Sequence, residues 1–318
     1  FMSAKLAFVF PGQGSQAVGM LAEVAASNSL VQETFAEASE ALGYDLWALS
    51  QEGPAEVLNQ TDKTQPAILT VSTAIYAVLE SYGLKPAAVA GLSLGEYSAL
   101  VAAGAISFND ALPLVQKRGI FMQEAVPEGA GSMTAIMGLE HEKVEELCRQ
   151  VSGDELVSPA NYNCPGQIVI SGHCAAVNRV VEKARAAGAK RITALKVSTP
   201  FHCLLLQSVE ERLAAELDQI IVSEPGLPVV FNVSAAFARE PQQIKANLVT
   251  QVSNPILWEQ SVHTLIDAGI ERFIGIGPGN SLSRLMKRIA PQLTTYSVET
   301  TADLEELFAA GILTGGHY

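Results

Sequence analysis

One serine of the sequence stands where a nucleophile could be formed. Ser93 is the centre of the segment GLSLG, residues 91–95, which fits the pattern G-x-S-x-G. In that pattern a sharp turn between a strand and a helix exposes the serine hydroxyl and aims the following backbone N–H groups at its target. A tight turn also favours small residues without any chemistry, so the pattern alone leaves a structural role for Ser93 open.

A serine hydroxyl is a poor nucleophile until a base takes its proton, so the five histidines come next. His202 follows the segment STPF, in which Pro200 forces an extended approach of the chain. No acidic residue lies shortly before His202, so a neutral group such as a backbone carbonyl must orient its ring. A lone histidine is more often an ordinary hydrogen-bonded residue, and that alternative stays open. The other four lie in charged or helical segments, at a glycine turn or in the terminal tail: His141, His173, His263 and His317.

Arg118 is the third candidate because its charge falls on an apolar stripe. At about 100° per residue, the segment NDALPLVQKRGIFMQEAV places Arg118 among Ala111, Leu114, Val115 and Met122. A guanidinium on such a face needs an anion. The anion is either a structural carboxylate, the commoner case, or a substrate carboxylate held by two parallel hydrogen bonds.

Alternating strands and helices must position these residues. Residues 5–12 and 87–92 read as buried strands, and residues 65–83 read as a largely apolar helix. A strand at 228–233 follows later in the chain, and residues 272–288 open with another strand. This order predicts a parallel sheet covered by helices, with sites at the carboxyl ends of the strands, where Ser93 would lie.

The pattern changes from about residue 128. The segments up to residue 198 read as β-α-β-β-α-β, which is the ferredoxin-like order. We therefore predict an α/β fold with a large α/β-hydrolase-like domain, residues 1–127 and 199–318, and an inserted ferredoxin-like subdomain, residues 128–198.

Composition excludes several classes of protein. No apolar run reaches about 18 residues and no basic, cleavable N-terminal signal is seen, so we expect a soluble cytoplasmic protein without a membrane partner. The four cysteines form no C-x-x-C pair, which argues for reduced thiols and against a cysteine zinc site. A net charge of −13 argues against nucleic-acid binding.

Two glycine-rich turns, residues 10–16 and 275–281, each follow a predicted strand. Neither has the spacing of a phosphate-binding loop, so tight strand-to-helix turns are the simpler interpretation. The backbone N–H of Gln13 in the first turn could nevertheless form an oxyanion hole with that of Leu94.

Taken together, six segments resemble one enzyme family: FVFPGQGSQ, GLSLGEYSALVAAG, QKRGIFMQEAV, NYNCPGQIVISG, STPFHC and IGPGNSL. In this order and spacing they resemble the malonyl-CoA:acyl carrier protein transacylases of bacterial fatty-acid synthesis. The resemblance covers roughly residues 4 to 300 and is far more specific than any single motif.

The resemblance implies a role for each matching residue. Ser93 would be acylated, His202 would be the base, and the backbone carbonyl of Gln251 would orient the histidine. The N–H groups of Gln13 and Leu94 would hold the oxyanion. The remaining implied residues bind substrate. Arg118 would bind the malonyl carboxylate, and Met122 and Phe201 would lie beside it. Phe201 would disfavour a methyl-branched extender. One residue departs from the family, which usually has histidine where this chain has Leu92.

The implied reaction is ping-pong transfer of a malonyl group from malonyl-CoA to the phosphopantetheine thiol of acyl carrier protein, by a monomer without metal or redox cofactor. Both partners are acidic, so a local basic patch is needed on this acidic chain. The densest candidates are Lys190 with Arg191 and Lys287 with Arg288, although a solvated surface explains them equally well. Two alternatives remain: a serine hydrolase, and a non-catalytic module that binds carrier protein.

Overall fold

A five-stranded parallel sheet forms the centre of the larger part of the molecule. The computed structural model describes residues 5–197 and 199–315. All pairings in this sheet are parallel, and β1 lies at its middle. The strands are, in order, β7 (Val229–Val230), β2 (Ala88–Gly91), β1 (Leu6–Phe10), β8 (Arg272–Ile276) and β9 (Thr294–Val298).

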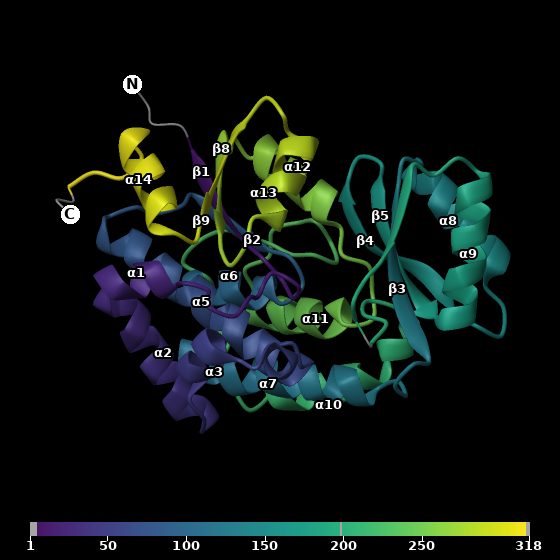
Figure 1. The fold of residues 1–318 in the computed structure, drawn as a ribbon, viewed down its shortest axis with the longest axis horizontal. Helices are drawn as coiled ribbons and strands as arrows, with labels where there is room; N and C mark the ends of the chain where they lie inside the picture. Colours follow the sequence, from purple (N-terminus) through teal and green to yellow (C-terminus); the bar gives the residue numbers. More distant parts are fainter. Residues whose placement is uncertain (1–4, 198, 316–318) are drawn as a thin grey trace.

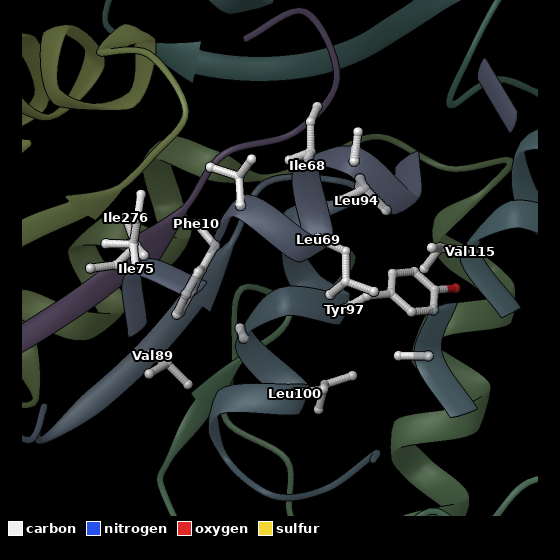
Figure 2. Packing of buried hydrophobic residues seen from close by; sticks show 14 of the residues in the cluster. Phe10, Ile68, Leu69, Ile75, Val89, Leu94, Tyr97, Leu100, Val115 and Ile276 are labelled. Atoms are coloured by element: carbon white, nitrogen blue, oxygen red, sulfur yellow. The ribbon is translucent and has the colours of Figure 1, made fainter. Parts of the chain in front are cut away.

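Both faces of this sheet are buried, which explains why its strands are apolar throughout. Leu6, Phe8 and Phe10 of β1 belong to one hydrophobic cluster, whereas Ala7 and Val9 belong to another. Because successive side chains of a strand point to opposite faces, the two clusters lie on the two sides of the sheet. Figure 2 shows Phe10 and Ile276 of the strands among Leu69, Ile75 and Tyr97 of the helical layer.

Helices supply both covering layers. α5 carries fourteen buried residues and packs mainly against α7 and α2, and α12 and α13 contribute to the second cluster. The helices of this part are α1 (Ala22–Ser27), α2 (Ser29–Leu42), α3 (Leu46–Glu52), α4 (Ala55–Leu58), α5 (Thr61–Ser81), α6 (Gly95–Ala102), α7 (Phe108–Glu124), α10 (Ser208–Leu217), α11 (Pro241–Gln251), α12 (Trp258–Asp267), α13 (Ser281–Ile289) and α14 (Thr301–Ala309).

The four strands between residues 131 and 194 form a separate antiparallel sheet. Its order, β4-β5-β3-β6, is that of a ferredoxin-like unit, and α8 and α9 cover it with a third hydrophobic cluster. Figure 1 shows this sheet beside the larger part, with α8 and α9 on its outer face. Its elements are β3 (Gly131–Met137), α8 (His141–Val151), β4 (Val157–Cys164), β5 (Gln167–His173), α9 (Cys174–Ala186) and β6 (Arg191–Ala194).

The two sheets confirm the predicted α/β class, while the division into domains at residues 128 and 198 stays a prediction. Backbone hydrogen bonds also connect the two parts. Tyr162 N–H donates to the Ile256 carbonyl at 2.9 Å, and Ile256 N–H donates to the Ala160 carbonyl at 2.8 Å. The outer edge of β4 is therefore paired with the segment that follows α11.

Two strands are shorter than their sequence predicts. The sequence predicts a strand over residues 191–198, the last of which lies outside the described residues, but β6 ends at Ala194. β7 consists of two residues rather than 228–233. After Val230 the side-chain amide of Asn232 donates to the Gly91 carbonyl at 2.6 Å, so a side chain replaces the next ladder hydrogen bond. Helix α5 begins four residues before the predicted start at residue 65.

Candidate active site

The Ser93 turn joins β2 to α6 at the carboxyl end of the parallel sheet. Ser93 has φ 55, the left-handed conformation, and its neighbours Gly91 and Gly95 permit this geometry. A Cβ atom on Gly91 would collide with the Gly95 carbonyl, and one on Gly95 would collide with that of Phe10. The turn is thus pressed against the end of β1, and Leu92 N–H donates to the Phe10 carbonyl at 3.0 Å.

His202 lies against the Ser93 hydroxyl. Its Nε2 atom is 2.7 Å from Ser93 Oγ, and its Nδ1 atom is 2.8 Å from the backbone carbonyl of Gln251. Because a carbonyl only accepts hydrogen bonds, Nδ1 carries the proton and Nε2 is free to accept one from the serine. The arrangement can therefore deprotonate Ser93 without an acidic residue.

Burial keeps this imidazole neutral. His202 is 3% exposed, and burial, together with the positive charge of Arg118, lowers its pKa to about 3. The carbonyl of Gln251 opposes this shift by accepting the Nδ1 proton. At neutral pH the ring is thus an unprotonated base.

Arg118 is buried beside the same hydroxyl. The guanidinium donates from Nη1 to Gln65 Oε1 at 2.8 Å, and from Nη2 to Gln251 Oε1 at 2.9 Å and to Ser93 Oγ at 3.3 Å. Its Nε atom has no hydrogen-bond partner among the described residues, although the side chain is only 1% exposed. Burial lowers its pKa, yet no carboxylate of the described residues forms an ion pair with it. A buried cation that meets only neutral oxygens favours an anionic ligand.

Asn232 and the side chain of Gln251 tie the reacting groups together. Asn232 Oδ1 accepts from Ser93 N–H at 2.7 Å and from the Gln251 amide at 3.1 Å. The same Gln251 amide donates to the Ser93 carbonyl at 3.0 Å. Gln251 therefore contacts Ser93, His202 and Arg118 at once, whereas the sequence singled out only its carbonyl.

The two N–H groups predicted for an oxyanion meet no acceptor among the described residues. Neither Gln13 N–H nor Leu94 N–H has a hydrogen-bond acceptor in the part of the chain that the structure describes. The first glycine turn is held beside Ser93, because a Cβ atom on Gly12 would meet the Leu92 carbonyl at 2.6 Å. The second glycine turn lies next to the first, with Ser15 Oγ 3.3 Å from Ser281 Oγ.

A hollow of about 340 Å³ opens beside Gln13. Thr61 of α5, which receives a 3.2 Å hydrogen bond from the Gln13 amide, lines it on one side. The segment after β6 lines the other side with Leu195, Lys196 and Val197. The hollow thus lies between the two parts of the molecule and reaches one of the predicted oxyanion residues.

The two predicted pocket residues occupy different positions. Met122 is buried on α7, and its sulfur lies 3.7 Å from the amide of Gln65, the residue that holds Arg118. Phe201 is 8% exposed, with its ring centroid 6.4 Å from that of His202. Leu92 packs, partly buried, against the cluster that contains Trp258.

The four predicted surface cations are all exposed and lie toward one end of the small sheet. Arg191 pairs in register with Met137, which pairs with Gln167, and Gln167 Oε1 accepts from Arg288 Nη1 at 2.9 Å. None of the four forms an ion pair with a described residue. We call this set the basic rim: Lys190, Arg191, Lys287 and Arg288.

Three of the remaining histidines lie away from Ser93. His141 contacts the Cys164 carbonyl at 3.1 Å, His173 accepts from Leu156 N–H at 2.8 Å, and His263 is on α12, while His317 lies outside the described residues. The four cysteines are free thiols. Within residues 5–197 and 199–315, no group of three or more metal-ligating side chains could hold an ion, and no helix is long and apolar enough to cross a membrane.

Three residues of the site escaped prediction from the sequence. Gln65 looked like an ordinary residue of an apolar helix, Asn232 lay near the end of a predicted strand, and Glu96 looked like an acid in the first turn of a helix. Of these three residues, only Glu96 could have been suspected from the sequence, because it lies three residues after the serine in GLSLGE.

Comparisons with known proteins agree with this geometry. The acyl transferase domain family matches residues 7–304. A malonyl CoA-acyl carrier protein transacylase of Salmonella typhimurium is 52% identical over 301 residues, which cover 94% of this chain and 97% of the relative.

Two solved structures are similar over almost the whole chain. An acyl carrier protein S-malonyltransferase from Vibrio cholerae has a TM-score of 0.94 at 48% identity, covering 96% of this chain and 100% of that one. A malonyl-transacylase in complex with a type II PKS acyl-carrier protein has a TM-score of 0.95 at 47% identity, with the same coverage. The chain belongs to the acyl transferase domain family and, within it, to the malonyl CoA-acyl carrier protein transacylases.

Proposed function

We propose that the protein transfers malonyl groups from malonyl-CoA to the phosphopantetheine thiol of acyl carrier protein, through a malonyl ester of Ser93. The observation that carries this proposal is the buried cation at the nucleophile: Arg118 Nη2 lies 3.3 Å from the hydroxyl that His202 can deprotonate. An acyl group attached to that hydroxyl and ending in a carboxylate would bring its charge to the guanidinium. An acetyl group would bring none.

The first half-reaction forms the ester. His202 Nε2 takes the proton of Ser93 Oγ while the oxygen attacks the thioester carbon of malonyl-CoA. The N–H groups of Gln13 and Leu94 hold the negative oxygen of the tetrahedral intermediate. When the C–S bond breaks, His202 returns the proton to the sulfur, and CoA leaves as its thiol. The carbonyl of Gln251 keeps the imidazole in the required tautomer throughout.

The second half-reaction reverses these steps. The thiol of the carrier's phosphopantetheine loses its proton to His202 and attacks the ester carbon, after which Ser93 regains a proton as the leaving group. Burial of His202 and Arg118 supports a site from which water is largely excluded, so that the thiol outcompetes hydrolysis. The groups named here need no metal or redox cofactor, which stays a prediction.

Substrate selection would rest on Arg118, with Met122 and Phe201 shaping the adjoining space. Gln65 and Gln251 hold the guanidinium in a fixed plane, which suits two parallel hydrogen bonds to a carboxylate. The hollow beside Gln13 suits the pantetheine arm, because one of the predicted oxyanion residues lines it. The basic rim would attract the acidic carrier protein and the phosphates of CoA.

We propose further that the large α/β domain comprises residues 1–127 and 199–318, and the ferredoxin-like subdomain residues 128–198. Action as a monomer in the cytoplasm, without membrane or nucleic-acid partners, likewise stays a prediction.

Labelling of the intact protein tests the proposed function. Malonyl-CoA should add one malonyl group, detected by mass spectrometry and mapped to Ser93, and holo acyl carrier protein should then remove it. The Ser93→Ala protein serves as the control and should stay unlabelled. Release of free malonate without a thiol acceptor would indicate a hydrolase instead, and the absence of any label would indicate a binding module.

A further inference from the structure

Glu96 is buried beneath the Ser93 turn, and the reaction described above gives it no task. Its side chain is 0% exposed, in the first turn of α6. Oε2 accepts from the backbone N–H of Asn232 at 2.7 Å, while Oε1 has no hydrogen-bond partner among the described residues. It is the only carboxylate among the buried residues of the described chain.

The surroundings of Glu96 contain a single positive charge. The titratable groups that interact with it are Arg118 from α7 and Tyr97 on its own helix, and His202 in turn interacts with Arg118. The buried faces of α5, α11, β1 and β2 contribute no charged side chain. Above its pKa, Glu96 is ionised and its charge balances that of Arg118 while no acyl group is bound.

A second carboxylate upsets this balance. A malonyl group on Arg118 would place two negative charges around one buried cation, and an uncompensated buried charge is costly. Glu96 can relieve the excess by taking a proton. Burial raises its pKa to about 8, even though Asn232 N–H, the charge of Arg118 and the side chain of Gln251 lower it. Tyr97, with its pKa raised to about 12 by burial, and His202, with its pKa lowered to about 3, keep their charge states near pH 8.

We propose that Glu96 is a specificity-determining residue, whose carboxyl group must be protonated when Arg118 holds the carboxylate of the acyl group. This inference rests on the proposed function. No bond of the substrate changes in this step: where Glu96 is ionised, its carboxylate takes a proton from solvent when a malonyl group binds. Malonyl loading is therefore favoured below the pKa of Glu96 and weakened above it, whereas acetyl loading lacks this dependence.

The ratio of malonyl to acetyl loading on Ser93, measured from the CoA thioesters without a thiol acceptor, reports this effect. Effects of pH that are common to both substrates cancel in the ratio. Between about pH 6 and about pH 9.5 the ratio should fall about tenfold, the change that a one-unit rise in the pKa of Glu96 on malonyl binding would produce.

Two variants identify the group responsible. Glu96→Gln keeps an oxygen for Asn232 N–H but cannot ionise, so its ratio should stay constant with pH. In Glu211→Gln, a change at an exposed acid of α10, the ratio should fall with pH as it does in the parent protein. A flat ratio in the parent, or an unchanged fall in Glu96→Gln, would overturn the inference. Failure of malonyl-CoA to label Ser93 at all would instead overturn the proposed function.

Proton uptake provides a measurement that does not depend on the folding of Glu96→Gln. Calorimetry of malonyl-CoA binding to Ser93→Ala at about pH 8.5, in buffers of different ionisation enthalpy, should reveal uptake of a substantial fraction of a proton. Acetyl-CoA is the matched ligand and should cause none. Equal uptake for the two ligands contradicts a role for Glu96.

Discussion

Arg118 and the basic rim carry the same charge in opposite surroundings. Arg118 is 1% exposed, and neutral oxygens hold it in place beside Ser93. The rim residues are exposed, and among them Arg288 alone donates side-chain hydrogen bonds to described residues, namely to Gln167 and to the Pro165 carbonyl. The chain has a net charge of −13. It thus has one cation, Arg118, where water is excluded, and several at the surface, where water screens their charge.

The contrast separates two functions of positive charge. Inside the site a carboxylate that meets Arg118 gains an interaction that water does not weaken, so the buried cation can discriminate between acyl groups. At the surface the same charge acts over a distance of about 10 Å at moderate salt, which favours encounter with acidic partners more than discrimination.

Loss of the reacting pair should have the largest effect. Ser93→Ala or His202→Ala should abolish formation of the malonyl enzyme, because the two side chains share one proton at 2.7 Å. The double variant should be little worse than either single variant, since groups that act as a unit are not additive. Single-turnover loading measures this, and independent, additive losses would contradict the pairing.

Removal of the buried charge should come next. Arg118→Ala should lower malonyl loading by roughly thirtyfold to several thousandfold, corresponding to about 2–5 kcal/mol for one member of a buried pair. Acetyl loading should fall far less, or rise. Arg118→Lys should restore activity only in part, because an ammonium cannot form the planar pair of hydrogen bonds. Equal losses for both acyl groups would make Arg118 a structural residue.

The hydrogen bonds around the pair should have an intermediate effect. Asn232→Ala leaves Ser93 N–H and the Gly91 carbonyl without their partners, at a cost of about 1–3 kcal/mol for each buried group. Thermal unfolding should occur several degrees lower, and loading should slow by about tenfold to a hundredfold. Asn178→Ala, on the exposed face of α9, is the matched control and should change neither quantity.

The basic rim should give the smallest effect, and one that depends on salt. Lys287→Glu should raise the KM for acyl carrier protein by about threefold to tenfold at low ionic strength, and less at high ionic strength. Arg288→Glu adds the loss of its contact to Gln167, so the two variants should be measured separately. Lys85→Glu makes the same charge change at an exposed residue before the amino end of β2, whereas Ser93 follows the carboxyl end of that strand, and it should leave the KM unchanged. An unchanged KM for Lys287→Glu at low salt would leave that side chain without a role.

The sequence predicted those features that depend on local pattern. The strand before Ser93, the glycines around it and the β-α-β-β-α-β order all follow from short-range periodicity and turn chemistry. Arg118 was recognisable because a charge on an apolar stripe of one helix is unusual.

The residues that escaped prediction act across long distances in the chain. Asn232 lies 139 residues from Ser93, and its side chain ends a strand by replacing a ladder bond, which no local pattern indicates. Glu96 has the position of an ordinary N-terminal acid, and only the packing of four elements around α6 removes it from water. Long-range hydrogen bonds and burial are properties of the assembled fold, so the sequence alone does not reveal them.

Ser93 and His202 share a backbone feature with a thermodynamic consequence. Their φ angles, 55 and 57, lie in the left-handed region that residues other than glycine rarely adopt. Each such residue costs roughly 1–2 kcal/mol, against a net folding stability of only about 5–15 kcal/mol. Glycine at either position would relieve the strain of the backbone, but it would also remove the side chain that reacts. The protein therefore holds its two reacting atoms together at the expense of conformational stability, so its most stable sequence and its active sequence differ at these two positions.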